Sequence, residues 1–226
     1  MAMIELNYRK ITEKIADNLT LAQIYGFYVL AMKSDYNTNE SHINQTTLAQ
    51  LLNVDRTTII RWLKVYEENN LLSVEHTHII NEDRQLVKKN IYKLNTENYK
   101  LVGDGLLNMN VSNEIKGFLI LIKCRCYNCT NLCEYSSREL AKTCKITQST
   151  IVRYINKCIA LGLIKRESKG ISLVNEKIFI PQKESVYYWV LKTYPQILTD
   201  KDIEFHTIFN NDKDYEQYIR RMETNK

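Results

Sequence analysis

The hydrophobic positions in the first half of the chain follow a helical period. Residues 20–34 are predicted to form a helix that is buried on most faces, because apolar residues recur at Leu21, Ile24, Phe27, Tyr28, Leu30 and Ala31. Polar, turn-like residues follow at 35–41. The next short helix is expected to be capped by Thr46 or Thr47, and its apolar face consists of Leu48, Leu51 and Leu52.

A turn, a third helix and two strands complete this segment. Asn53 and Val54 form the turn, and Asp55 is a suitable N-cap for the helix after it. The buried stripe of that helix consists of Ile59, Leu63 and Tyr66, at i, i+4 and i+7. Leu71–Val74 is expected to form a short strand, and residues 85–94 return beside it as the second strand of a hairpin.

The same order of elements returns in the second half. Residues 115–124 predict a helix, and Ser136 or Ser137 is expected to cap the next helix, which holds Leu140 and Ala141. Lys145 and Ile146 form the turn, and Thr147 caps a helix with the buried stripe Ile151, Ile155 and Cys158. A second hairpin follows, with strands at 163–168 and 171–174 and a turn at Lys169 and Gly170.

Direct residue matches show that the two halves are copies. Gly26–Leu30 matches Gly117–Leu121 at an offset of 91 residues, and Tyr36 and Asn37 match Tyr127 and Asn128 at the same offset. After one inserted residue, Thr58–Leu63 matches Thr150–Ile155 at an offset of 92. Two matched segments separated by a single insertion indicate a duplicated structural unit.

The run TLAQLLNVDRTTIIRWLKVYEENNLL resembles the winged helix-turn-helix family of bacteria, phages and plasmids. Both copies carry the residues of the family pattern, over roughly residues 15–100 and 110–180: Leu48-Ala49, Thr58-Ile59, Arg61 and Leu71-Leu72, then Leu140-Ala141, Thr150-Ile151, Arg153 and Leu163-Ile164. The resemblance implies a mainly α-helical α+β protein with small β-hairpin wings, built as two tandem winged-helix units. Tandem winged-helix chains of this size resemble plasmid and phage replication initiators, which bind repeated origin sites.

We predict three segments from this pattern. Residues 1–105 form the first winged-helix unit, residues 106–182 the second, and residues 183–226 a helical tail. Helices are expected in the tail at 186–194 and 214–222. The tail is expected to dock on the second unit, and dimerisation and recruitment of a partner are the alternatives.

The resemblance also implies which side chains meet DNA. The third helix of such a unit enters the major groove, where Arg can bridge guanine, Gln can bridge adenine and Thr can touch the thymine methyl. The candidate base contacts are Arg56, Thr57, Thr58 and Arg61 in the first unit, and Gln148, Ser149, Thr150 and Arg153 in the second. The candidate contacts to phosphates or the flanking minor groove are Lys64, Lys157, Lys165, Arg166 and Lys169.

Alternatives apply to some of these positions. Thr58 and Thr150 are nearly as well suited to packing at the helix start as to base contact. In the first wing, plain solvation is an equal explanation for Arg84, Lys88 and Lys89.

Charge fits a polyanionic partner and distinguishes the two units. The chain has a net charge of +5 and a pI near 8.7. Lys145–Gly170 holds six basic residues against one acidic residue, whereas Arg56–Leu72 holds three against two. We therefore expect the second unit to be the stronger phosphate binder, and the first to bind weakly or to support a protein contact.

Cys124, Cys126, Cys129 and Cys133 form a CxCxxCxxxC cluster that matches no standard zinc spacing. The six cysteines are expected to be reduced structural thiols, and the cluster to be dispensable for folding and DNA binding. A metal-binding or redox-sensing protein is the alternative. The chain lacks the GxxxxGK[ST] motif, so an ATP-binding P-loop is not expected. We predict no catalytic residue, no cofactor and no metal.

The favoured function is sequence-specific duplex DNA binding as a plasmid or phage replication initiator. A transcriptional regulator, including an autoregulatory one, is the alternative. Further partners are a second copy of the chain or proteins of replication or transcription. No run of 18 apolar residues predicts a membrane span, and the start MAMIELNYRKITEK lacks an apolar signal core, so a cytoplasmic location is expected.

Overall fold

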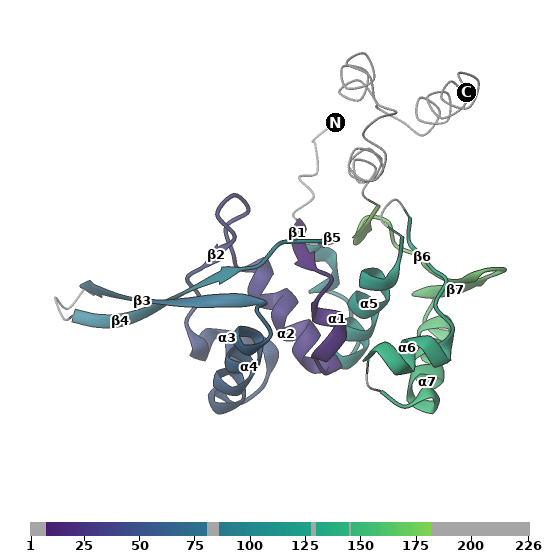
Figure 1. Ribbon diagram of the computed structural model, residues 1–226, viewed down its shortest axis with the longest axis horizontal. Helices are drawn as coiled ribbons and strands as arrows, with labels where there is room; N and C mark the ends of the chain where they lie inside the picture. Colours follow the sequence, from purple (N-terminus) through teal and green to yellow (C-terminus); the bar gives the residue numbers. More distant parts are fainter. Residues whose placement is uncertain (1–7, 81–85, 128–129, 145, 182–226) are drawn as a thin grey trace, which may run out of the picture. The chain divides into compact units, whose positions relative to one another are not determined.

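The computed structural model describes residues 8–80, 86–127, 130–144 and 146–181 (Figure 1). The described part is mixed α+β, with seven α-helices and three small antiparallel sheets. Its residues up to Pro181 belong to one compact unit. Residues 182–226 form the other unit and lie outside the described residues, and so do the helices predicted in the tail. None of the helices in the described part has both the length and the apolar character needed to cross a membrane.

The first copy contains the three predicted helices and more strands than predicted. Its elements are β1 (Tyr8–Thr12), α1 (Ile15–Asn18), α2 (Leu21–Met32), β2 (Glu40–Ser41), α3 (Gln45–Leu52), α4 (Arg56–Glu68), β3 (Leu72–Ile80) and β4 (Leu86–Leu94). The hairpin was expected to begin with a short strand, but β3 and β4 have nine residues each. Their register runs from Leu72 opposite Leu94 to Ile80 opposite Leu86.

The second copy follows the same order with a shorter hairpin. Its elements are β5 (Tyr99–Gly103), the 3-10 helix η1 (Asp104–Leu106), α5 (Asn113–Arg125), β6 (Leu132–Cys133), α6 (Ser137–Cys144), α7 (Gln148–Ala160), β7 (Ile164–Glu167), β8 (Gly170–Leu173) and β9 (Phe179–Ile180). Glu167 pairs with Gly170, so the turn consists of Ser168 and Lys169 and not of Lys169 and Gly170 as predicted. Gly170 serves a close approach instead, because a Cβ there would collide with the Cys133 carbonyl group.

Helix caps agree with the sequence at most positions. Thr147 caps α7 by accepting from the Thr150 backbone N–H, and Ser136 and Glu139 form a capping box at the start of α6. Asp55 occupies the N-cap position of α4 without a side-chain hydrogen bond. The prediction of Thr46 or Thr47 was wrong, because Asn44 caps α3 and accepts from the Thr47 N–H at 2.6 Å.

Backbone hydrogen bonds repeat between the two copies. Behind the turn of the first copy, the Val54 N–H donates to the Ala49 carbonyl at 3.0 Å, and Ile146 donates to Ala141 at 3.2 Å in the second. Leu71 donates to Tyr66 after α4, and Leu163 donates to Cys158 after α7, both at 2.9 Å. In both cases the donor and the acceptor of the first copy lie 92 residues before the donor and the acceptor of the second copy. The duplication seen in the sequence is therefore also a duplication of backbone hydrogen bonding.

A third sheet joins the two copies through one shared strand. Its order is β1–β5–β9, with Lys10 opposite Leu101 and Leu101 opposite Ile180. Strand β5 therefore pairs with β1 of the first copy along one edge and with β9 of the second copy along its other edge. None of these three strands was predicted from the sequence.

The core centres on α2 and α5, which pack against each other between the two copies. Ten of the twelve residues of α2 and ten of the thirteen of α5 are buried. A Cβ at Gly117 would overlap the Leu21 carbonyl group, so the two backbones touch at this glycine. In Figure 1 the pairs α3–α4 and α6–α7 lie on opposite sides of this centre, and their hairpins point away from each other.

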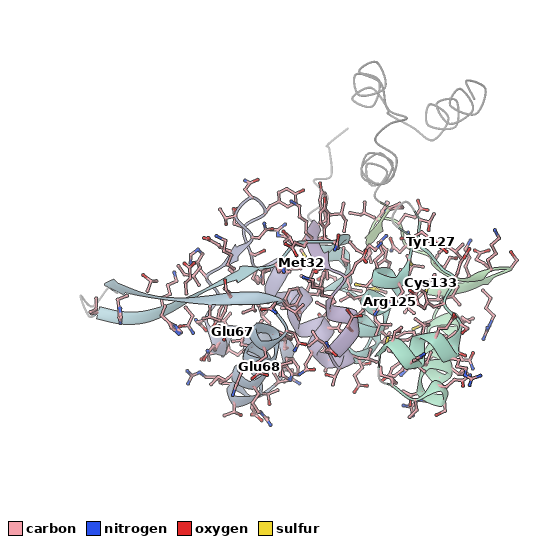
Figure 2. The ribbon with its side chains drawn as sticks, in the orientation of Figure 1. Met32, Glu67, Glu68, Arg125, Tyr127 and Cys133 are labelled. Atoms are coloured by element: carbon pink, nitrogen blue, oxygen red, sulfur yellow. The ribbon has the colours of Figure 1, made fainter. Side chains whose placement is uncertain are left out.

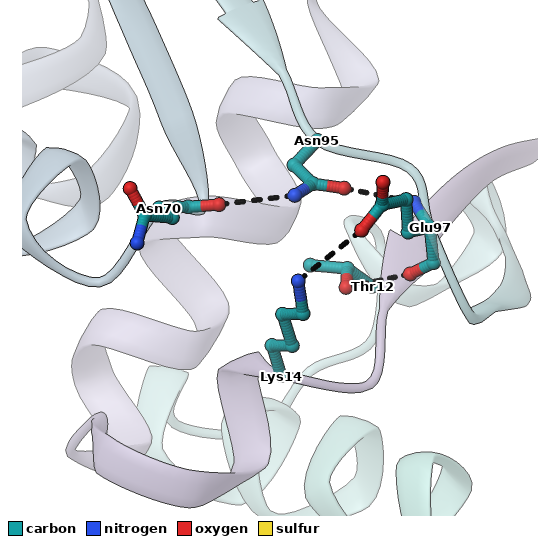
Figure 3. A network of polar contacts seen from close by, with 5 residues as sticks. All are labelled: Thr12, Lys14, Asn70, Asn95 and Glu97. Atoms are coloured by element: carbon teal, nitrogen blue, oxygen red, sulfur yellow. Dashed lines mark hydrogen bonds and ion pairs between the residues drawn. The ribbon is translucent and has the colours of Figure 1, made fainter.

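Polar contacts connect the segment after β4 with the end of β1 and with the residues that follow α4 (Figure 3). Asn95 donates to the Asn70 carbonyl at 3.1 Å and accepts from the Glu97 N–H at 2.9 Å. Thr12 donates to the Glu97 carbonyl at 2.9 Å, and Lys14 pairs with the Glu97 carboxylate at 3.3 Å. The segment between β4 and β5 is thereby held against both α4 and β1.

Candidate nucleic-acid interface

Helix α4 presents most of its predicted contact residues to solvent. Arg56, Thr57, Arg61 and Lys64 are exposed and Thr58 is half-buried. The tight turn before the helix is possible because Asn53 takes a left-handed conformation with φ of 52°. The opposite stripe, Ile59, Leu63 and Tyr66, is buried as predicted.

Short side-chain contacts orient the two arginines of α4. Arg56 donates from Nη2 to Gln45 Oε1 on α3 at 3.2 Å. Arg61 donates from Nη2 to the Thr58 hydroxyl at 3.1 Å. Both contacts are exposed, so they position the guanidinium groups without removing them from solvent.

Helix α7 repeats this arrangement with different side chains. Gln148, Ser149, Arg153 and Lys157 are exposed and Thr150 is half-buried. Gln148 donates from Nε2 to the Ser137 hydroxyl on α6 at 3.3 Å. This contact is the counterpart of Arg56 with Gln45, because both pairs join the first residues of successive helices at the offset of 92.

The hydroxyls of Thr58 and Thr150 have partners within the protein. Thr58 accepts from Arg61, and the Thr150 hydroxyl lies 2.8 Å from that of Thr147. Both residues are also half-buried, which favours the packing interpretation of these two positions over base contact.

A neighbouring tyrosine supports Arg153. The Arg153 guanidinium lies 5.7 Å from the centre of the Tyr154 ring. Tyr154 stacks on Phe118 of α5 and donates its hydroxyl to Glu114 at 2.9 Å. The side chain of Arg153 is therefore backed by a ring that is itself anchored to the core.

Charge differs between the two helices in the way the sequence predicted. Helix α4 ends in the exposed acids Glu67 and Glu68 (Figure 2), and Lys64 pairs with Glu68 at 3.8 Å. Helix α7 carries no acidic residue, and Arg153 and Lys157 remain its exposed cations. An anion beside α7 therefore meets less repulsion than one beside α4.

The second hairpin adds further basic side chains beside α7. Lys165, Arg166 and Lys169 are all exposed. Arg166 donates to Asn156 Oδ1 of α7 at 3.3 Å and thereby bridges helix and hairpin. Lys165 pairs with Glu167 at 3.1 Å, which offsets part of this charge.

The first hairpin leaves a small hollow beside α4. Its walls combine apolar and polar side chains from α3, α4, β3 and β4, and they include Gln45, Ile60, Lys64, Glu67, His76 and Asn90. The His76 ring nitrogen Nδ1 lies 2.9 Å from Asn90 Oδ1 across the two strands. Arg84 and the side chain of Lys88 lie outside the described residues, and Lys89 is half-buried, so the alternative of plain solvation stays open for this wing.

Two apolar residues on the exposed faces were not among the predicted contacts. Ile60 on α4 is 43% exposed and Val152 on α7 is 36% exposed. They occupy the same position at the offset of 92. The helical period places both residues away from the buried stripes, so their exposure could have been predicted from the sequence.

The described cysteines are core residues. Cys124, Cys126 and Cys133 are buried, and burial raises the pKa of their thiols to about 12, 12 and 11. Cys129 lies outside the described residues, and within the described part no three His, Cys, Asp or Glu side chains gather as metal ligands would. This burial changes the expectation that the cluster is dispensable, because serine at Cys126 or Cys133 would place a hydroxyl in the core.

Buried cations near the shared sheet were not predicted. Lys123 has no exposed surface and donates to Asn131 Oδ1 at 2.7 Å, and Asn131 donates to the Phe179 carbonyl of β9 at 2.8 Å. Burial lowers the pKa of Lys123 to about 8. Lys100 is also buried and pairs with Glu13 at 2.9 Å. These side chains join the second copy to the shared sheet and lie apart from the exposed helix faces.

No family model matches the sequence, and no curated protein shows significant similarity to it.

Proposed function

We propose that the chain binds duplex DNA in a sequence-specific manner through two winged helix-turn-helix units. The first unit contains α2, α3 and α4 with the hairpin β3–β4, and the second contains α5, α6 and α7 with the hairpin β7–β8. The observation that carries the proposal is the pair of equivalent helices α4 and α7, each with an exposed arginine at the same position, Arg61 and Arg153. A helix after a tight turn that exposes arginine and hydroxyl groups suits the donor and acceptor pattern of the major groove.

The second unit supports this proposal through its charge. Arg153 and Lys157 on α7, together with the exposed cations of the second hairpin, offer several positive charges to phosphates, and α7 itself holds no acidic residue. Phosphate contacts of this kind fix the position of the helix in the groove, and the base contacts then select the sequence.

A salt titration on selected duplexes tests this proposal. Random duplex fragments are selected with the purified protein, and the affinity for the best fragment is measured between about 50 and 200 mM salt. With roughly 5–8 phosphates neutralised, the affinity should fall by orders of magnitude. The matched control is the double variant Arg61→Ala, Arg153→Ala, which should lose selectivity. Failure to select any duplex, or an affinity independent of salt, would contradict the proposal.

We further propose that the biological role is initiation of plasmid or phage replication, as the family resemblance implies. A plasmid without its own origin, supplied with the gene and the selected site, should then replicate in a bacterial host. Repression of a promoter beside the site, without replication, would instead identify a transcriptional regulator.

A further inference from the structure

Ile60 and Val152 are apolar residues that lie outside the hydrophobic core. Both are β-branched, and such residues are poor helix formers, so they cost stability on an exposed helix face. Neither takes part in the hydrophobic core or in the layer of partly buried residues packed against it. Single exposed apolar residues are common on proteins, so exposure alone carries no conclusion.

Repetition in both copies distinguishes these two residues. Around them the exposed positions differ between the copies: Arg56 corresponds to Gln148 and Lys64 to Asn156. The exposed positions that stay alike are a hydroxyl residue (Thr57 and Ser149), an arginine (Arg61 and Arg153) and this β-branched residue. An apolar group has thus been kept beside two positions, Arg56 and Lys64, whose counterparts in the second copy are different residues.

The neighbours of this position are groups suited to DNA. On α4, Ile60 lies one turn after Arg56 and one turn before Lys64, and it borders the hollow beside the first hairpin. On α7, Val152 lies one turn after Gln148 and beside Arg153. An apolar side chain set among donors matches one feature of the major groove, the C5-methyl group of thymine.

We propose that Ile60 and Val152 each contact the C5-methyl group of a thymine, one in each half of the DNA site. This inference rests on the proposed function and adds to it two residues that determine specificity. It predicts that both half-sites contain a thymine beside the base contacted by the arginine, although the half-sites differ elsewhere. The same contact would accept the methyl group of 5-methylcytosine, which presents identical chemistry.

Deoxyuridine substitution is the direct test, because it removes only the methyl group. Each thymine of the selected duplex is replaced in turn, and the dissociation constant is measured. For the wild-type chain we expect an increase of about fourfold at one position in each half-site, which corresponds to about 0.8 kcal/mol for one methyl group. The variant Ile60→Ala should lose the effect in the first half-site alone, and Val152→Ala in the second alone. Leu161→Ala, which removes an exposed residue at the end of α7, is the control and should keep both effects.

Replacement of the identified thymine by cytosine or 5-methylcytosine then separates the two sources of the methyl group. A gain from methylation in the wild type but not in the alanine variant supports the contact. If uracil has no effect at any position, or an equal effect in wild type and variants, the inference is overturned while the proposed function stands. If the wild-type chain binds no duplex, the proposed function fails, and this inference fails with it.

Discussion

At the scale of single residues, the two copies have kept their arginines in different surroundings. Arg61 is hydrogen-bonded to Thr58 on a helix that ends in Glu67 and Glu68, whereas Arg153 rests on Tyr154 on a helix without acidic residues. Equal positions therefore do not imply equal contributions to binding.

We predict that Arg153→Ala weakens DNA binding more than Arg61→Ala. Loss of a bidentate guanine contact costs about 1–3 kcal/mol. Glu67 and Glu68 repel the DNA phosphates near α4, so the cost of losing Arg61 should be at the lower end of this range. Fluorescence anisotropy on the selected duplex gives both affinities, and the exposed Lys177 provides a control, Lys177→Ala, that removes one charge before β9. An Arg61→Ala variant that is equally or more damaging would reverse the ranking.

Lys123 gives a prediction for the dependence of stability on pH. Its pKa is about 8 in the folded chain and 10.5 as the ordinary value, so the unfolded state binds the proton more tightly. Lys123 alone should therefore raise the free energy of unfolding by about 1 kcal/mol between about pH 7 and 9. The buried thiols act in the opposite direction over the upper part of this range, since their raised pKa values favour ionisation in the unfolded chain. The contribution of Lys123 is therefore measured as the difference between the wild type and a variant without this lysine.

Denaturant unfolding at pH 7, 8 and 9 checks this prediction. From pH 7 to pH 9 the wild type should gain about 1 kcal/mol relative to Lys123→Met, whereas Lys142→Met, at an exposed position of α6, should follow the wild type. A difference between the wild type and Lys123→Met that does not change with pH would contradict the prediction.

At the scale of elements, the helices of both copies could be predicted because their signals are local. The stripe Ile59, Leu63 and Tyr66 and the cap Thr147 need only a few neighbouring residues. Strands β1, β5 and β9 could not be predicted in this way. Tyr8 pairs with Gly103 across more than ninety residues, and such five-residue strands carry little periodicity of their own.

The packing of α2 on α5 gives a prediction for Gly117, and the equivalent glycine of the first copy, Gly26, provides the control. At Gly117 an added methyl group would meet the Leu21 backbone, which cannot move without shifting a helix. At the equivalent Gly26 it would meet the Trp62 ring at 2.8 Å and the hydroxyl of the buried Tyr66 at 2.9 Å, which are side-chain atoms and not backbone. We expect Gly117→Ala to lower the free energy of unfolding by at least about 3 kcal/mol.

Gly26→Ala should cost less, about 1–2 kcal/mol, because the Trp62 and Tyr66 side chains must shift but no helix backbone has to move. Thermal unfolding of the two variants side by side measures the difference. Equal melting temperatures would show that the contact between α2 and α5 is looser than the backbone approach implies.

At the scale of the whole described unit, the exposure of the candidate contact residues could be predicted from the sequence, but their mutual placement could not. Helical period alone separates Arg61 and Arg153 from the buried stripes. Nothing in the period indicates that β5 is shared by the two copies, or that Lys116 of α5 donates to the Leu107 carbonyl at 2.7 Å beside Tyr25 of α2. The junction depends on such long-range pairings, which arise only once both copies have folded.

This junction leads to the last prediction, which concerns the spacing of the two half-sites. Recognition helices on one face of B-DNA sit about 34 Å, or 10–10.5 base pairs, apart, so one chain should protect roughly 18–25 base pairs with two major-groove segments. A shared strand and a packed helix pair leave α4 and α7 little freedom to move apart. Insertion of five base pairs between the half-sites should therefore reduce the affinity to that of a single half-site.

Insertion of ten base pairs provides the decisive comparison. It restores the rotational phase of the half-sites but separates them by a further turn, so a rigid pair of units still reaches only one of them. Two units on a flexible tether would instead recover most of the native affinity, because the second binding event stays intramolecular. Hydroxyl-radical footprints of verified monomers on the native, five-pair and ten-pair duplexes distinguish these cases. Two protected grooves on the ten-pair duplex would show that the copies move independently, despite the strand that they share.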